Sequence, residues 1–217
     1  MEFFAARAHK RTLPLTRVTT ESLPEVLESL APGTRRWVAH AGFEGKPGTV
    51  LEYPDEGGGP GGVLVGVSES ATLWEYAALP GKVRPGRYAF DDSLPAEEAS
   101  LAPLGWGLAQ YRFDRYKKME TGRPVLVWPA GAEQADVRRQ LEAVFLAKDL
   151  INTPAHDMNP AALADEAKRL GRAHGARVTV TVGEKLLEKN YPTVHAVGRA
   201  AAVEPRLVDL RWGKPSD

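Results

Sequence analysis

The spacing of apolar and polar positions predicts alternating strands and helices in the first part of the chain. Apolar residues at 13–19 and 35–43 follow strand-like patterns, whereas the apolar positions at 22–30 recur at helical spacing. Two more apolar runs, at 49–53 and 61–68, flank a segment rich in glycine and proline and predict a hairpin. This order of elements is typical of an α/β or α+β domain.

Most of the apolar positions between residues 72 and 151 recur at helical spacing. We predict a short helix at 72–80 and a longer one at 101–116, followed by a short buried strand at 124–129 that prolines bound. The longer helix places one apolar stripe at Leu104, Leu108 and Tyr111. A long helix is predicted at 131–151 from the spacing of Val137, Leu141, Val144, Phe145 and Leu150.

The segment after this helix contains two prolines, Pro154 and Pro160, that mark a helix end and a helix start. The helix must end near Asn152, because the residue that precedes Pro154 is pushed out of helical backbone. Asn159 and Pro160 then predict a new helix start, since asparagine accepts a bond from a free N–H and a first-turn proline loses none. This helix is expected to run to about His174.

The last part of the chain predicts a strand at 177–182, a short helix at 184–189 and a strand at 206–212. A helix, strand, helix, strand order is typical of a parallel α/β sheet. Two strands with their helices cannot bury both faces of a sheet, so we expect a second domain that is incomplete at Asp217. The side chains expected to need further cover are Val178, Val180, Val182, Val208, Leu210 and Trp212.

Composition narrows the function classes. Lys plus Arg and Asp plus Glu each number 28, so no net field favours nucleic acid, although a local basic patch stays open. The absence of cysteine excludes disulfides, thiolate nucleophiles and Cys-type zinc sites, and it fits a reducing compartment. No apolar run approaches the roughly 20 residues of a membrane span, and the first residues lack a signal-peptide core. We therefore expect a cytoplasmic protein that is neither exported nor inserted in a membrane.

Three short motifs have both a chemical and a structural interpretation. The glycines of 56–62 could cradle phosphate, but they precede a strand and lack the lysine of such loops, which favours a flexible hairpin loop. The GVSES run at 66–70 lacks the second glycine of a nucleophile elbow, so its serine is expected to cap the helix that begins near Thr72. Bases and aromatics alternate at 111–118 and could bind nucleic acid, but a helix C-terminus also favours such bases.

Histidine spacing gives no metal motif. The chain contains no HExxH or comparable ligand spacing among its five histidines, which are His9, His40, His156, His174 and His195. His156 and Asp157 are the most tempting pair, yet adjacent residues of an extended loop point apart. We expect loop packing and helix capping there, ahead of metal ligation.

Several of these segments together resemble one known family. The run DLINTPA at 149–155, Asn159-Pro160, EKLLEK at 184–189 and HAVGRAAAVEPRLVDLRW at 195–212 follow in this order, after LGWGLAQYRFDRYKK at 104–118. The run at 149–155 is similar to the domain junction of the leucyl (cytosol) aminopeptidase family, and the other segments resemble that family as well. Position 156 departs from it, with histidine where the family usually has asparagine.

The resemblance implies a mixed N-terminal α/β domain with a central sheet at 1–133, a connecting helix at 134–150, and the start of an incomplete α/β catalytic domain at 151–217. It also implies a cytoplasmic hydrolase that removes the N-terminal amino acid from peptides, contains two divalent metal ions such as manganese or zinc, and forms a hexamer. The two later motifs that hold the family's metals and catalytic groups do not occur here, so the resemblance assigns no catalytic, cofactor-binding or metal residue to this chain. We expect it to be inactive alone and to serve packing and assembly. The alternatives are a stand-alone α/β binding or assembly module and, less in keeping with a neutral chain, a nucleic-acid-binding protein using 111–118.

Overall fold

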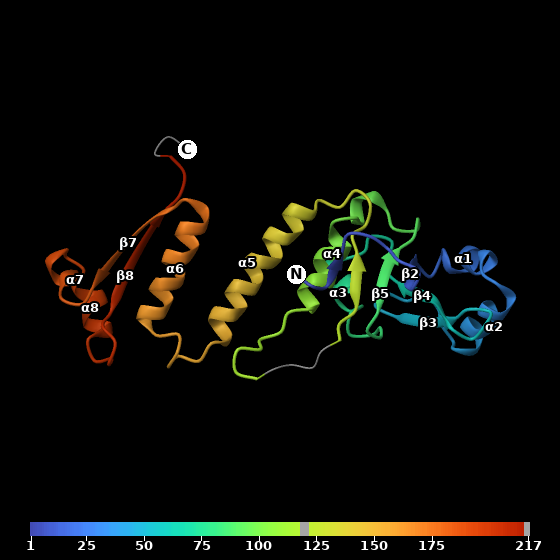
Figure 1. Ribbon diagram of the computed structural model, residues 1–217, viewed down its shortest axis with the longest axis horizontal. Helices are drawn as coiled ribbons and strands as arrows, with labels where there is room; N and C mark the ends of the chain where they lie inside the picture. Colours follow the sequence, from blue (N-terminus) through green and yellow to red (C-terminus); the bar gives the residue numbers. More distant parts are fainter. Residues whose placement is uncertain (118–121, 215–217) are drawn as a thin grey trace. The chain divides into compact units, whose positions relative to one another are not determined.

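The computed structural model describes residues 1–117 and 122–214 and divides the chain into two compact units, Met1–Phe145 and Leu146–Asp217. The division falls inside the long helix α5 (Gln134–Asn152). Figure 1 shows the sheet of the first unit and the helix-and-hairpin arrangement of the second. The α/β class predicted from the sequence is confirmed.

Six strands in the described part of the first unit form one sheet in the order β1-β6-β5-β2-β4-β3. Only β3 runs antiparallel to its neighbour, as the hairpin pattern predicted. In the centre, Leu15 of β2 pairs with Val63 of β4, and Thr12 of β2 pairs with Arg87 of β5. The strands are β1 (Phe4–Ala5), β2 (Thr12–Val18), β3 (Val50–Pro54), β4 (Pro60–Gly66), β5 (Arg87–Phe90) and β6 (Val125–Val127).

Helices cover both faces of this sheet. Successive strand residues point to opposite faces, so Val63 and Val65 of β4 join one core cluster while Leu64 joins the other. The first cluster includes Trp106 and is covered by α3 (Leu73–Ala77), α4 (Leu101–Ala109) and the first turns of α5. The second is covered by α1 (Leu23–Ser29) and α2 (Pro32–His40). A short 3-10 helix, η1 (Ala96–Glu98), precedes α4.

The predicted strand at 35–43 is wrong, because this segment lies mostly within helix α2. Pro32 occupies the first turn, where a missing N–H costs nothing. Thr34 and Val38 are buried four residues apart, which is a helical and not a strand period. The short apolar run WVAH is compatible with either a strand or a helix, and Pro32 before it favours the helix.

The helix predicted at 101–116 ends early, at Ala109. The side chain of Gln110 donates to the carbonyl of Pro124 at 2.7 Å, and Arg123 donates back to the Gln110 carbonyl at 3.0 Å. These bonds hold the chain against the segment before β6 and replace another helical turn. The pattern also failed to indicate β1 and β5, which are only two and four residues long.

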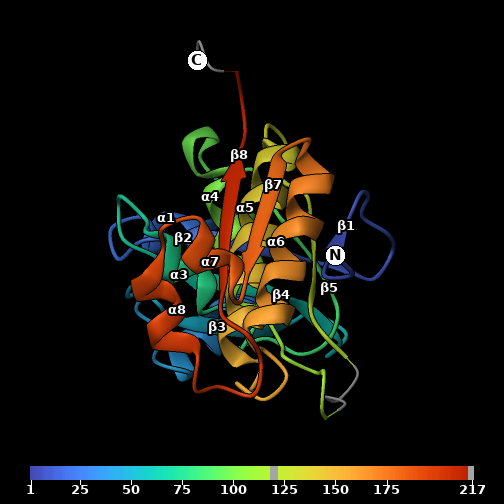
Figure 2. The ribbon, with the colours of Figure 1, turned by 90° about the vertical axis from the view of Figure 1, so that its left-hand side faces the viewer.

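The second unit contains α6 (Pro160–His174), β7 (Arg177–Val182), α7 (Lys185–Glu188), α8 (Pro192–Gly198) and β8 (Arg206–Arg211). Helix α6 lies close against β7, because a Cβ added at Gly171 would be 2.3 Å from Val178 Cγ2. Figure 2 shows β7 and β8 side by side with α6 beside them. Among the six side chains expected to need further cover, Leu210 and Trp212 are exposed, at 41% and 76%.

The parallel sheet predicted for this unit is wrong, since β7 and β8 pair antiparallel from Arg177↔Arg211 to Val182↔Arg206. The connection contains two short helices and not one helix that returns along the strands. Its ends meet where the N–H of Gly183 donates to the carbonyl of Pro205 at 3.0 Å. Because β8 thus begins beside the end of β7, it must run in the opposite direction.

Candidate functional site

The junction between α5 and α6 lies wholly in the second unit and is held by local hydrogen bonds. Thr153 is buried, and its hydroxyl donates to the carbonyl of Asp149 at 2.6 Å, which closes the last turn of α5. Asn159 Oδ1 accepts from the N–H groups of Ala161 and Ala162 at 3.0 and 3.1 Å. The predicted cap at Asn159 is therefore confirmed, and the predicted helix end is too, since Gly175 follows α6 with φ of 68°.

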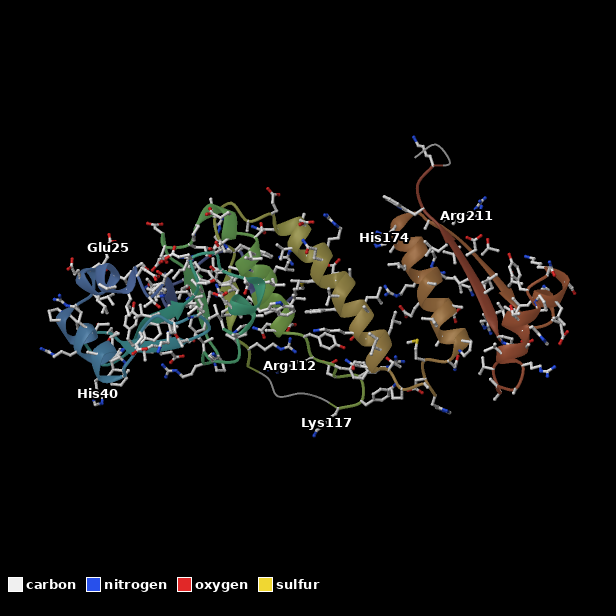
Figure 3. All side chains as sticks on the ribbon, turned by 180° about the vertical axis from the view of Figure 1, so that it is seen from behind. Glu25, His40, Arg112, Lys117, His174 and Arg211 are labelled. Carbon is white, nitrogen blue, oxygen red and sulfur yellow. The ribbon has the colours of Figure 1, made fainter. Side chains whose placement is uncertain are left out.

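Metal chemistry has no visible basis in the described residues. Within 1–117 and 122–214, no group of three or more His, Asp or Glu side chains gathers closely enough to hold a metal ion. His156 uses its carbonyl to accept from Asn159 at 3.4 Å, and Asp157 donates its N–H to Pro154 at 2.9 Å, so both belong to the turn before α6. His174 ends α6 and lies far along that helix from the turn (Figure 3).

His195 has a carboxylate neighbour. Its Nε2 lies 3.2 Å from Glu184 Oε1, and the imidazole is mostly covered while the carboxylate is exposed. A single exposed partner of this kind joins α8 to the start of α7 and contributes little to stability. It is a contact of the β7–β8 connection and not a metal site.

The glycine-rich run is a hairpin loop, as predicted. It joins β3 to β4, and Asp55 Oδ1 accepts from the N–H groups of Gly57 at 2.9 Å and Gly59 at 2.7 Å. The backbone donors that would have to meet a phosphate are thus turned toward a carboxylate of the loop itself. The loop shapes a turn and does not cradle an anion.

Ser68 binds a carboxylate, and the prediction that it caps α3 is wrong. Its N–H and hydroxyl donate to Glu75 at 2.7 and 3.0 Å, while Thr72 occupies the N-cap and its N–H donates to the same carboxylate at 3.2 Å. Burial raises the pKa of Glu75, but the hydrogen bonds from Ser68 and Thr72 outweigh it, so the pKa lies below its ordinary value. Glu75 therefore ties the end of β4 to the start of α3.

A buried ion pair next to this carboxylate escaped the sequence analysis. Arg17 leaves β2 and makes two parallel bonds to Glu98 of η1, at 2.9 and 3.0 Å, with the side chains only 10% and 7% exposed. The same guanidinium donates to the carbonyls of Ser68 and Glu69 at 3.1 and 3.0 Å. The hydroxyl of Tyr76 also donates to Glu98. The signal was Arg17 itself, the single charged residue in a strand of otherwise apolar residues and threonines.

The electrostatics of this cluster favour fixed protonation states. Burial lowers the pKa of Arg17, yet the bonds and charge of Glu98 raise it further, and the net shift is upward. Burial and the neighbouring carboxylate both raise the pKa of Tyr76 strongly. A guanidinium and a phenol that stay protonated cannot act as bases near neutral pH. The cluster is a structural link between β2, α3 and η1.

The bases at 111–117 lie beyond the last turn of α4, which ends at Ala109, so the interpretation that they stabilise a helix C-terminus is wrong. Figure 3 shows Arg112 and Lys117 on an irregular segment; Lys118 lies outside the described residues. Bases and aromatics contact one another there, since the Arg115 guanidinium carbon lies 5.8 Å from the Tyr116 ring centre. The proposal that this segment binds nucleic acid stays an untested alternative.

Comparison with known proteins assigns the two parts of this chain to one class of peptidase. The family model of the M17 aminopeptidase N-terminal domain matches residues 13–129, and that of the cytosol aminopeptidase catalytic domain matches 145–217. A protein named "Probable cytosol aminopeptidase 1" from Shewanella oneidensis is 30% identical over 215 residues, which is 89% of this chain and 43% of that protein. Peptidase B of Cronobacter sakazakii is 31% identical over 136 residues, covering 58% of this chain and 31% of that protein.

Solved structures agree with this assignment. The crystal structure of the cytosol aminopeptidase from Coxiella burnetii matches with a TM-score of 0.90 at 31% identity, covering 100% of this chain and 47% of that one. The bottromycin maturation enzyme BotP in complex with Mn matches with a TM-score of 0.73 at 29% identity, covering 95% of this chain and 46% of that one. The chain belongs to the M17, or cytosol, aminopeptidase family. The resemblance seen in the sequence is thereby confirmed, and the chain spans less than half the length of these relatives.

Proposed function

We propose that these residues form the N-terminal domain and the beginning of the catalytic domain of a metal-dependent aminopeptidase, which hydrolyses the N-terminal amino acid from peptides. The observation that carries this proposal is the order of the two family matches on one chain, with the capped start of α6 inside the second match. Relatives that match over most of this chain are named as cytosol aminopeptidases. Their name also supports a cytoplasmic location. Separately, none of the described helices combines the length and the apolar composition of a membrane span.

The domain assignment is part of the same proposal. Residues 1–133 would be the N-terminal domain, 134–150 a connecting helix and 151–217 the start of the catalytic domain. Two observations support it: the division between the compact units falls inside α5, and the two family matches leave residues 130–144 between them. A helix without an internal proline or glycine is suited to join two domains.

The residues described here do not fit the metal centre that the family implies, because no group of three ligand side chains is present among them. We propose that the ligands for two divalent ions, manganese or zinc, come from parts of the catalytic domain that relatives have beyond the matched region. The structure of BotP with Mn supports manganese as one candidate. The role of the present residues would then be packing and assembly, within a homo-oligomer such as the hexamer expected from the resemblance.

The decisive experiment compares two proteins. An antibody raised against this chain would detect the endogenous protein in cell extract, and we expect roughly twice the 23.6 kDa of the 217 residues, given the lengths of the relatives. The purified endogenous protein should release the chromophore from a leucine amide in the presence of manganese, and a chelator should abolish the release. The 217-residue chain should be inert under the same conditions.

Two outcomes would overturn the proposal. An endogenous protein of 23.6 kDa without hydrolytic activity would favour the stand-alone binding or assembly module. Chelator-sensitive turnover by the 217-residue chain, retained through a second purification, would show that a metal site exists within these residues.

A further inference from the structure

A pocket of about 600 Å³ lies at the amino ends of the central strands of the first unit, at the opposite edge of the sheet from the Arg17 cluster. It is formed where the turn before β2, the start of β4 and the loop before β5 come together. The lining residues that bear on its chemistry are Lys10, Arg11, Thr12, Arg84, Gly86 and Tyr88. A volume of this size is typical of sites for small molecules.

The charge of this pocket departs from that of the chain. Acidic and basic residues balance over the whole sequence, yet three cationic side chains and no carboxylate line the pocket. In the described residues, the Lys10 ammonium and the Arg11 guanidinium have no hydrogen-bond or ion-pair partner. Lys10 and Arg11 are therefore cations that no carboxylate of the described residues pairs with, whereas Arg84 pairs with Glu52.

Arg84 is only partly engaged. Its Nε donates to Glu52 at 2.7 Å, in a pair whose arginine side chain is 67% exposed. The described residues provide no bond to its two terminal nitrogens. A guanidinium presents five N–H donors in a planar fork, so this one retains donors for an anion while Glu52 limits its motion.

Rigid elements hold the pocket open. Tyr88 is buried, and its hydroxyl donates to the Arg84 carbonyl at 2.9 Å, which ties the loop to β5. A side chain at Gly61 would lie 2.7 Å from the backbone of Pro54 and Asp55, so glycine is required where β4 begins. At Gly86, a Cβ would reach only ordinary contact with the Tyr88 ring, at 3.5 Å.

We propose that this pocket binds a small anion that carries phosphate groups, held by Lys10, Arg11 and Arg84. Phosphate oxygens match the forked donors of arginine, and a lysine adds a compact positive charge. A small ligand is favoured over a polymer because the cations gather around a concave site on a chain with no net charge, whereas a nucleic-acid surface needs an extended basic strip. The proposal does not depend on the peptidase activity proposed above.

Titration calorimetry of the 217-residue chain with inorganic pyrophosphate tests the proposal. We expect saturable 1:1 binding, and a loss of about tenfold or more in affinity for the variant Lys10→Ala/Arg11→Ala, since two charge-assisted contacts are removed. The matched control is Arg35→Ala/Arg36→Ala, which removes the same charge from neighbouring exposed positions on α2. This control should bind pyrophosphate as the unchanged chain does.

Amide chemical shifts identify the place of binding. Pyrophosphate should shift the N–H signals of Gly61 and Gly86, and this readout decides alone if the double variant does not fold. Equal weakening in the control, no saturation at millimolar pyrophosphate, or shifts confined to other regions would overturn the proposal. Binding of a short DNA duplex in preference to pyrophosphate would overturn it as well, because the recognised feature would then be a polymer.

Discussion

Replacing Glu98 by glutamine should destabilise the first unit far more than a change of one atom suggests. The glutamine keeps an oxygen that can accept from Tyr76, and it has nearly the same volume. What is lost is the charge that compensates Arg17, a side chain only 10% exposed. Removing one partner of a buried ion pair typically costs about 3–5 kcal/mol, because the other charge stays buried without compensation.

The contacts of Arg17 narrow the expected loss of unfolding free energy. Arg17 also donates to two backbone carbonyls, at 3.1 and 3.0 Å, which continue to solvate part of the charge after the substitution. We therefore expect a loss of about 3 kcal/mol, at the lower end of the range. Against the ~5–15 kcal/mol that stabilises a typical domain, this is a large fraction.

Urea denaturation with tryptophan fluorescence measures the effect, since four of the five tryptophans lie in the first unit. The double variant Arg17→Met/Glu98→Gln serves as the control, because it removes the buried charge that Glu98→Gln leaves behind. We expect the double variant to be more stable than Glu98→Gln alone. A loss below about 1 kcal/mol for Glu98→Gln, or strictly additive effects of the two changes, would show that the pair is not buried as described.

Three further changes test other contacts. Asn159→Ala should lower the free energy of unfolding by ~1 kcal/mol and speed hydrogen exchange in the first turn of α6. Asn159→Asp, which keeps a capping oxygen, should do neither. An unchanged denaturation midpoint for the alanine variant would contradict the cap. The pKa of Glu75 lies below its ordinary value, so its carboxylate stabilises the fold above about pH 4.5 and this contribution is lost as the pH falls through the lowered pKa. Glu75→Gln should therefore flatten the acid limb of a stability–pH curve, and an identical limb would argue against the hydrogen bonds from Ser68. Gly105→Ala should lower the free energy of unfolding by ~2 kcal/mol, because the new Cβ would lie 2.5 Å from a backbone oxygen of α3. Gly107→Ala should lower it less, because the new Cβ would meet only the end of a leucine side chain. A larger loss of thermal stability for Gly107→Ala than for Gly105→Ala would refute this.

Local rules predicted the elements that local interactions stabilise. The hairpin of β3 and β4, the end of α5 before Pro154 and the start of α6 at Asn159 all depend on residues close in sequence, and all were read correctly. The same rules placed the glycine-rich loop between two strands. Capping and turn chemistry are thus visible without any knowledge of the fold.

Several of the errors come from contacts that local patterns do not show. Helix α4 ends at Ala109 because Gln110 bonds to Pro124, a partner that no local pattern indicates. The antiparallel direction of β8 depends on how α7 and α8 fold the connection. The pairing of Arg17 with Glu98 joins residues 81 positions apart, so the sequence could show an unusual arginine but not its partner.

The first strand of the sheet has a consequence for how the protein is made. Among the described strands, β1 pairs with β6 alone, Phe4 with Leu126, so the partner of Phe4 is translated about 120 residues later. At roughly 5–20 residues per second, Phe3 and Phe4 emerge from the ribosome many seconds before the surface that buries them exists. In the folded unit the rings of Phe4 and Trp128 stack with their centres 4.0 Å apart, and Trp128 is also synthesised late. Phe3 and Phe4, which are synthesised before the rest of this sheet, are thus among its last residues to be buried, and they offer nascent-chain chaperones a place to bind.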